Sequence, residues 1–340
     1  KIGASNDSNG KCNRERLVVF SVVSYGSVDQ VLLQLESLRK SLLFKHSNRV
    51  KYIVLENYPY TRSEKQKVEK NLAEAGFLVR DVAARASEDN VDTDIQYLFN
   101  QSNVGYARGH NQVYSMFPST DLFVVLNADV SFESDFTVRP FLRILHEKNA
   151  VGIVGPKIVE AACPNKQHGP YEYESLRERY TSLLWRIIRK TEPIYYKATK
   201  AEEDALRRGR EVYRVSGAAM FVSGVAFRES GGFDPKTFLF AEEAILAERM
   251  RRAGYGVWYE PSVQVYHIGN ESIGRETTKI ARFKMRFFSD LYYYRRYRSV
   301  GSVAQLAAAL SLLLTLIVLG FNSVKRNIVR RIAGDETERT

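Results

Sequence analysis

An unbroken apolar run that ends in Asn-x-Asp constrains this chain more than any other feature. Leu122–Leu126 is a run of five apolar residues, and Asn127, Ala128 and Asp129 follow it directly. Such a run is typical of a strand buried on both faces of a parallel sheet, and ligands of open α/β sheets bind beyond the carboxyl ends of these strands. We therefore expect Asn127 and Asp129 at a ligand site, although both residue types also occur in simple turns.

The two polar residues of this motif suit a divalent cation. In an extended segment, side chains two residues apart point to the same side. The amide oxygen of Asn127 and the carboxylate of Asp129 are hard oxygen ligands, which suit Mg²⁺ or Mn²⁺ carrying a diphosphate. The pattern predicts that Mg²⁺ or Mn²⁺ is the cofactor.

A small glycine-containing turn upstream predicts a second part of the same site. Asn103–Asn111 opens an amphipathic segment that runs to about Phe117. The backbone N–H groups of such a turn, together with a helix N-terminus, attract phosphate. Neither a Gly-x-Gly-x-x-Gly nor a Gly-Lys-Ser/Thr pattern occurs here, which disfavours a Rossmann dehydrogenase and a P-loop NTPase.

Strands and helices are expected to alternate through the first part of the chain. Apolar spacing predicts a strand at Leu17–Tyr25, a helix at Gln30–Leu43, a strand at Val50–Glu56 and a helix at Thr61–Gly76. This βαβ alternation predicts an α/β fold with a mostly parallel sheet and helices on both faces.

Several blocks in a defined order resemble one known family. In chain order they are Leu17–Tyr25, Tyr52–Asn57, Asn103–Asn111, the strand ending at Asp129, Val215–Phe221, Gly231–Asp234, Phe240–Glu243 and Arg251–Tyr255. Together they resemble the family 2 nucleotide-sugar glycosyltransferases, which have the GT-A fold, and most closely the bacterial rhamnosyltransferase-like branch. The resemblance runs from about Leu17 to Ser272.

The resemblance implies a role for each matching residue. It implies that Glu243 is the catalytic base with Glu242 beside it, and that Asp129 and His267 bind the metal. It implies a donor-binding set comprising Ser24, Tyr25, Glu56, Asn57, Asn103, Gly105, Tyr106, Ala107, Asn111, Asn127, Ala128 and Gly217.

Three positions depart from the family pattern. Asn127 stands where many members have a first aspartate, so the metal would depend on the single carboxylate of Asp129. Glu56 stands where an aspartate contacts the base of the nucleotide. Glu243 stands where aspartate is the usual catalytic base, and its side chain is one methylene longer.

Two of these assignments have simpler alternatives. Glu242 and Glu243 open a predicted helix that runs to Arg252, and acidic residues in a first helical turn commonly complement the helix dipole. His267 lies in the segment Val265–Ser272, where a lone histidine can equally be structural.

The C-terminal part has a different composition. The chain has 340 residues and a net charge of +11, and most of this excess lies between Arg275 and Arg331, where twelve basic residues face two acidic ones. Val303–Phe321 carries no charge and is about as long as a membrane span. Its basic flanks suit a re-entrant or interfacial helix at an anionic leaflet better than a clean membrane span. The alternative is a C-terminal helix buried against the catalytic domain.

We therefore expect three parts in the chain. Residues 1–14 are polar and would form a flexible tail, residues 15–274 the GT-A domain, and residues 275–340 the membrane-associating segment. Within the domain, Cys163–Arg214 is an insert and a candidate for acceptor contact or a membrane-facing ridge, or alternatively a helix hairpin covering the sheet. Cys12 and Cys163 are the two cysteines of the chain and lie far apart in the sequence, so we expect a reducing compartment. They have no metal-ligand spacing, so we expect no structural zinc.

The sequence thus predicts a metal-dependent, inverting glycosyltransferase. The donor would be a nucleoside-diphosphate sugar and the acceptor a saccharide, lipid-linked in our reading, at the cytoplasmic face of a bacterial inner membrane during cell-surface polysaccharide synthesis. The alternatives are a sugar-phosphate nucleotidyltransferase and a basic membrane- or nucleic-acid-binding protein without catalysis. Because the basic residues flank an apolar run, we expect membrane contact and no nucleic acid partner.

Overall fold

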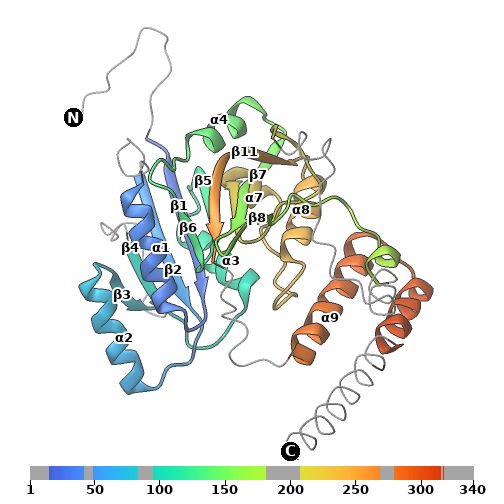
Figure 1. Cartoon of the computed structure of the whole chain (residues 1–340), viewed down its shortest axis with the longest axis horizontal. Coiled ribbons are helices and arrows are strands. Elements are labelled where there is room, and N and C mark those ends of the chain that lie inside the picture. Colours follow the sequence, from blue (N-terminus) through green and yellow to red (C-terminus); the bar gives the residue numbers. More distant parts are fainter. Residues whose placement is uncertain are drawn as a thin grey trace, which may run out of the picture. The chain divides into compact units, whose positions relative to one another are not determined.

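The structure, a computed structural model, describes residues 15–41, 49–82, 95–180, 207–268, 279–314 and 317 (Figure 1). Its elements in chain order are β1 Leu17–Ser24, α1 Val28–Lys40, β2 Arg49–Glu56, α2 Arg62–Glu74, β3 Leu78–Asp81, β4 Ile95–Phe99, α3 Tyr106–Met116, β5 Leu122–Asn127, β6 Val130–Phe132, α4 Arg139–Glu147, β7 Val151–Glu160, β8 Cys163–Gln167, β9 Arg210–Glu211, β10 Ala219–Ser223, α7 Gly224–Glu229, α8 Glu242–Arg252, β11 Gly256–His267 and α9 Lys279–Tyr297.

One mixed sheet organises these elements. Its strand order is β3-β4-β2-β1-β5-β10-β7-β11-β6, with β8 paired to β7 and β9 to β11. The pairs among β3, β4, β2, β1 and β5 are all parallel, as the βαβ alternation predicts. Beyond β5 the pairing is mixed, because β10 runs antiparallel to both β5 and β7.

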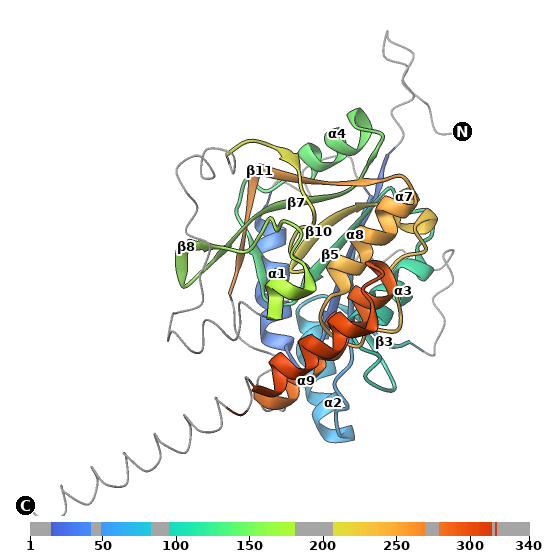
Figure 2. The ribbon, with the colours of Figure 1, turned by 90° about the vertical axis from the view of Figure 1, so that its right-hand side faces the viewer.

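Helices cover both faces of the sheet, and each face has its own core. On β1, Val18, Phe20 and Val22 pack with α1, α2 and α4. Val19 of the same strand belongs to the core beneath α3, α7 and α8. Figures 1 and 2 show α1 on one side of the sheet and α3 and α8 on the other. This alternation follows from the two-residue period of a strand, and it confirms the predicted α/β architecture.

The predicted elements of the first part are confirmed with small shifts at their ends. Thr61 is the N-cap of α2 and forms a capping box with Glu64, and Gly76 follows the helix with a φ of +83°. The helix expected at Gln30–Leu43 is α1 and begins two residues earlier, at Val28. Its expected end at Leu43 lies outside the described residues.

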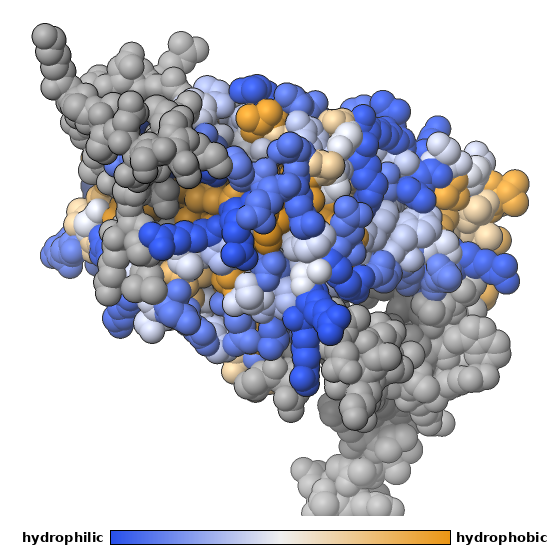
Figure 3. Space-filling model, turned by 90° about the horizontal axis from the view of Figure 1, so that it is seen from above, coloured by the Kyte–Doolittle hydropathy of each residue, from blue (hydrophilic) through white to orange (hydrophobic). Residues whose placement is uncertain are grey.

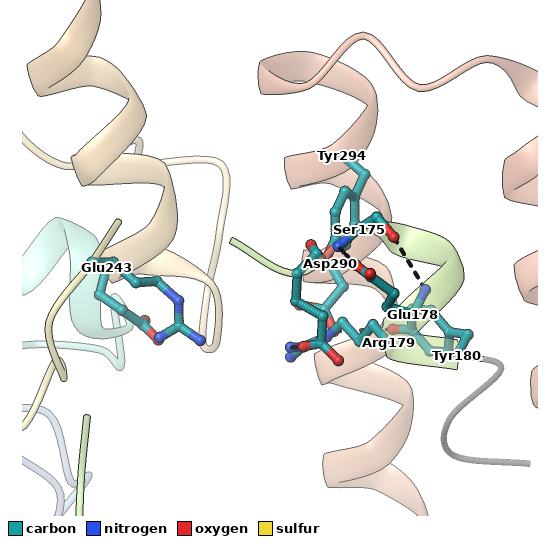
Figure 4. A network of polar contacts seen from close by, with 9 residues as sticks. Ser175, Glu178, Arg179, Tyr180, Glu243, Asp290 and Tyr294 are labelled. Atoms are coloured by element: carbon teal, nitrogen blue, oxygen red, sulfur yellow. Dashed lines mark hydrogen bonds and ion pairs between the residues drawn. The ribbon is translucent and has the colours of Figure 1, made fainter. Parts of the chain in front are cut away.

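The described chain divides into two compact units. The first comprises residues 1–172 and 202–289, and the second comprises 173–201 and 290–340. Inside the second unit, the buried carboxylate of Asp290 accepts hydrogen bonds from Arg179 Nε (2.7 Å) and the Tyr180 hydroxyl (2.9 Å), as Figure 4 shows. Ser311, on a helix at 302–314, donates to the Tyr180 carbonyl at 3.0 Å. This network connects 173–180 to both C-terminal helical stretches.

The helix at 302–314 is apolar but divided between two environments. Ala308 and Leu312 are buried. Its exposed apolar residues, with 52% to 84% of the residue accessible, are Val303, Leu306, Leu310, Leu313 and Leu314. Ile317, beyond them, is 46% exposed. In the described part of the chain, no helix has both the length and the apolar character needed to cross a membrane. The expected tail at 1–14, the middle of the insert at 181–206 and most of 315–340 lie outside the described residues.

Candidate active site

Most of the predicted site residues lie at one edge of the sheet. In the parallel register, Ser24 at the end of β1 lies opposite Glu56 of β2, and Val23 lies opposite Asn127 of β5. The carboxyl ends of these strands therefore place Ser24, Glu56 and Asn127 side by side. Because β10 is antiparallel to β5, its beginning returns to the same edge, where Asn127 N–H donates to the Ala218 carbonyl at 2.9 Å.

The two predicted metal ligands lie together. The structure places His267 Nε2 3.3 Å from Asp129 Oδ2. The reason is the antiparallel pairing of β11 with β6, which puts His267 opposite Val130 and lets Ile268 N–H donate to the Asp129 carbonyl at 2.8 Å. A second histidine, His168, packs its ring 5.0 Å from that of His267.

Asp129 and His267 are suited to hold a divalent cation together with a diphosphate. Two neighbouring ligands of an octahedral ion with bonds of ~2.1 Å lie about 3 Å apart, close to the observed separation of Asp129 and His267. Among the described residues, no group of three or more His, Cys, Asp or Glu side chains could hold an ion by itself. The remaining ligands would therefore have to be diphosphate oxygens and water.

Glu56 is buried, and hydrogen bonds from the protein occupy its carboxylate. Oε1 accepts from the backbone N–H groups of Gly26 (2.9 Å) and Tyr58 (2.8 Å). Oε2 accepts from the hydroxyls of Ser24 (2.9 Å) and Tyr97. A carboxylate with four donors shapes the loops that follow β1 and β2. One result is that the rings of Tyr25 and Tyr58 meet edge to face at 5.2 Å.

The glycine turn before α3 is held by several contacts. Asn103 Oδ1 accepts from Gly105 N–H at 3.0 Å, and Asn57 Nδ2 lies 3.5 Å from the Gly105 carbonyl. Gly105 has a φ of +80°, and a Cβ there would lie 2.6 Å from the Phe238 carbonyl oxygen. The Tyr106 N–H donates to that same oxygen at 3.2 Å. The segment that carries Phe238 therefore lies directly over the turn predicted to bind phosphate.

Two of the predicted donor residues on α3 make structural contacts. The Asn111 side chain donates to the Phe233 carbonyl at 2.8 Å and accepts from its N–H at 3.0 Å, which ties α3 to the loop before α8. Ala107 is fully buried in the core beneath α3. Ala128 is also buried, in the core on the other face of the sheet. A contact between Ala107 or Ala128 and a donor would therefore have to use the backbone.

The two candidate catalytic carboxylates open α8, as predicted. Glu242 is buried, whereas the Glu243 side chain is 25% exposed. Glu243 Oε1 accepts from Arg214 Nη1 at 2.9 Å. Burial raises the pKa of Tyr106 well above its usual value, and the nearby charges of Glu242 and Glu243 raise it further. The Tyr106 hydroxyl donates to the Gly217 carbonyl at 2.7 Å, so the turn before α3, the start of β10 and α8 meet here.

The backbone before α8 adopts an unusual conformation. Phe240 and Ala241 both have positive φ values, of 74° and 66°. Left-handed backbone at consecutive non-glycine residues is strained, and such strain occurs mainly where the surrounding structure holds a segment in place. Here Ser289 donates to the Leu239 carbonyl at 2.7 Å, and the Arg286 guanidinium lies over the Phe240 ring.

Three residues of this region were not predicted from the sequence. They are His168, which lies beside His267, Arg214, which pairs with Glu243, and Tyr171, whose ring lies against Arg214. Arg214 and Tyr171 both belong to the predicted insert Cys163–Arg214, near its two ends. No local pattern marks them, because their proximity depends on an isolated β-bridge between residues 43 positions apart.

Comparisons with known proteins agree with this fold. The sequence matches the model of the family described as "Glycosyltransferase like family 2" over residues 7–287. The chain therefore belongs to this glycosyltransferase family, and the predicted membership is confirmed.

Individual relatives are more distant or match only in part. An N-acetylglucosaminyl-diphospho-decaprenol L-rhamnosyltransferase of Mycobacterium tuberculosis (strain H37Rv) is 37% identical over 67 residues, which cover 20% of this chain and 22% of the relative. The same enzyme of strain CDC 1551 matches equally. The matched segment thus spans about a fifth of these curated relatives. The likeness agrees with the predicted rhamnosyltransferase-like branch.

Two solved structures share the fold. GalNAc-T7 with UDP, GalNAc and Mn²⁺ has a TM-score of 0.55 at 10% identity, covering 85% of this chain and 48% of that one. The mannosyltransferase PcManGT from Pyrobaculum calidifontis, with GDP-Man and Mn²⁺, has a TM-score of 0.50 at 12% identity, covering 93% and 81%. At these identities the likeness concerns the fold alone, which is GT-A-like.

Proposed function

We propose that this protein transfers a sugar from a nucleoside-diphosphate sugar to an acceptor hydroxyl, with inversion at the anomeric carbon and with the help of a divalent metal. The observation that carries the proposal is the pair Asp129–His267 at the carboxyl edge of the sheet. Asn127, two residues before Asp129, donates its N–H to the carbonyl of Ala218. Ala218 follows Gly217, which borders Glu243, so the metal pair and Glu243 belong to the same region.

The proposed reaction uses Glu243 as the general base. Glu243 accepts the proton of the acceptor hydroxyl as that oxygen bonds to the anomeric carbon, and the bond from this carbon to the diphosphate breaks. Asp129 and His267 would hold the metal, which when bound offsets the negative charge that grows on the leaving diphosphate. Glu242, buried beside Glu243, supports the first turn of α8.

We further propose that the acceptor is a lipid-linked saccharide and that the protein works at the cytoplasmic face of a bacterial inner membrane. The name of the mycobacterial relatives supports a lipid-diphosphate acceptor. The exposed apolar residues at 303–317 and the basic Arg295, Arg296 and Arg298 support contact with an anionic membrane surface. Cell-surface polysaccharide synthesis is the setting that these features favour.

Donor hydrolysis over a panel of nucleotide sugars, with Mg²⁺ or Mn²⁺ and with a chelator, tests the proposal. We expect at least one donor to be hydrolysed with metal and none with the chelator. Asp129→Ala should abolish turnover and weaken metal-dependent donor binding, because it removes the single carboxylate of the Asn-x-Asp motif. Normal turnover of Asp129→Ala, or of the wild type with chelator, would show that the metal proposal is wrong.

A further inference from the structure

The side chain of Arg214 is held in place from two sides. Its Nη1 lies 2.9 Å from Glu243 Oε1, and its guanidinium carbon lies 4.1 Å from the centroid of the Tyr171 ring. The two backbones also pair, since Tyr171 N–H donates to the Arg214 carbonyl at 2.9 Å and Arg214 N–H donates back at 3.2 Å. Arg214 is thus a planar group clamped between a ring and a carboxylate, with 18% of its side chain exposed.

Helix stability does not explain why a cation lies here. Glu243 is in the first turn of α8, where the helix dipole favours anions and disfavours cations. An ion pair that remains partly exposed also adds little to stability. The arrangement does fix the direction of the Glu243 carboxylate, and it leaves one of its oxygens for another partner.

The second oxygen of Glu243 borders a position without a side chain. A Cβ placed on Gly217 would lie 3.9 Å from Glu243 Oε2 and 3.7 Å from the Tyr106 hydroxyl oxygen. Among the described residues, no hydrogen bond to Oε2 is found. The absence of a side chain at Gly217 therefore leaves room beside Oε2, next to the Tyr106 hydroxyl.

We propose that Arg214 is a positioning residue that holds Glu243 through Oε1, so that Oε2 receives the acceptor hydroxyl in the space beside Gly217. This inference rests on the proposed function of Glu243 as the base. The proton moves from the acceptor hydroxyl to Oε2, the acceptor oxygen bonds to the anomeric carbon, and the nucleoside diphosphate leaves with the electron pair of the broken C–O bond. Tyr171 contributes by keeping the guanidinium plane fixed.

Arg214→Gln and Arg214→Lys in the full chain test the first half of the proposal. We expect Arg214→Gln to lower kcat for transfer by about 10- to 100-fold, since a slightly misplaced catalytic group costs a factor of this order. The KM for the donor should stay within about twofold, as for a group that acts in the transition state. Arg214→Lys keeps the charge but loses the planar stacking on Tyr171, so it should recover only part of kcat.

The pH profile separates positioning from a general structural role. The charged and titratable groups facing Glu243 are Arg214, Tyr171, Tyr106 and Glu242. Only the Arg214 change removes a positive charge from this set, so the acid limb of kcat should move to higher pH in Arg214→Gln. Lys40→Gln is the control, because Lys40 on α1 pairs at 2.6 Å with the exposed Glu36, away from the candidate site, and should leave both kcat and the profile unchanged.

Gly217→Ala tests the second half and should fold, because its Cβ would make only ordinary van der Waals contacts. We expect it to lower transfer to the acceptor by at least tenfold while hydrolysis of the donor by water, a smaller nucleophile, falls less. If Arg214→Gln lost the circular dichroism signal of the folded protein, the proposal would be judged on the kcat of Arg214→Lys and on acceptor transfer by Gly217→Ala.

Unchanged kcat and pH profile in the Arg214 variants, or normal acceptor transfer by Gly217→Ala, would overturn this inference while leaving the proposed function intact. A wild-type protein that processes no nucleotide sugar would overturn both.

Discussion

At the scale of single residues, the two glutamates at the start of α8 have different surroundings. Glu243 is partly exposed and paired with Arg214, whereas Glu242 is buried. Since a base must reach its substrate, exposure favours Glu243 for this role. We predict that Glu243→Gln lowers transfer by roughly 100-fold or more with donor affinity unchanged, and that Glu242→Gln has a smaller effect on kcat. Steady-state kinetics and a donor-binding titration measure both, and the opposite ranking would exchange the two roles.

His110 is a second residue whose environment makes a prediction. It is fully buried on α3, its Nδ1 lies 2.7 Å from the Ser21 hydroxyl, and burial lowers its pKa to about 3. The folded protein therefore binds no proton at His110 between its folded pKa and the usual value of about 6.5, whereas the unfolded chain does. The free energy of unfolding should then fall as the pH is lowered through this window, by at most about 1.4 kcal/mol per pH unit from this residue.

Urea unfolding at pH 7 and pH 5 measures this dependence. Between pH 7 and pH 5, the free energy of unfolding should fall less in His110→Asn than in the wild type, whatever the stability of the variant at pH 7. His146→Gln, at an exposed position on α4, is the control for losing a histidine. If the free energy of unfolding fell as much in His110→Asn as in the wild type, another group would be responsible for the pH dependence.

At the scale of elements, the turn before α3 depends on having no side chain at Gly105. Gly254, after α8, has a similar φ of +88° but nothing within 4 Å of its Cβ position. We predict that Gly254→Ala costs about 1 kcal/mol from backbone strain alone, and that Gly105→Ala costs about 1 to 3 kcal/mol more because of the Phe238 backbone. Thermal or urea unfolding of both variants gives the difference. Equal losses would mean that the Phe238 segment moves away at no cost.

The Gly105 substitution should also affect the donor. The Phe238 segment continues into the strained residues Phe240 and Ala241 and then into Glu243. A displaced Phe238 should therefore alter both the turn and the start of α8. We expect weaker donor binding in Gly105→Ala than in Gly254→Ala, measured in the same titration.

At the scale of the whole molecule, the C-terminal helix has features of both alternatives considered for it. Ala308, Leu312 and the Ser311 hydrogen bond show a face packed within the second unit. The other face exposes apolar side chains at helical spacing. Figure 3 shows hydrophobic side chains in separate groups among hydrophilic ones on one face of the protein. An exposed apolar stripe near basic residues is typical of a helix that lies on a membrane.

Vesicle co-sedimentation tests this membrane contact. We predict that the full chain binds anionic vesicles more tightly than neutral ones and that salt weakens the preference, because the basic residues act through a screened surface potential. Replacing the exposed Leu306, Leu310 and Leu313 with serine should reduce binding several-fold without loss of donor binding. Leu33→Ser, at an exposed apolar position on α1, is the control. A wild-type protein that ignores anionic vesicles would contradict the proposed location.

The sequence by itself determined the local features of this protein. Apolar spacing and capping residues placed β1, α1, β2, α2, α3 and α8 within a few residues, because helices and strands form from contacts between near neighbours. The Asn-x-Asp run and the ordered blocks also indicated the glycosyltransferase family. What only the tertiary structure decided are contacts between distant residues. Glu243 meets Arg214 beside a β-bridge, and His168 packs against His267. Such pairings depend on strand register and on the path of the whole chain, which no local pattern specifies.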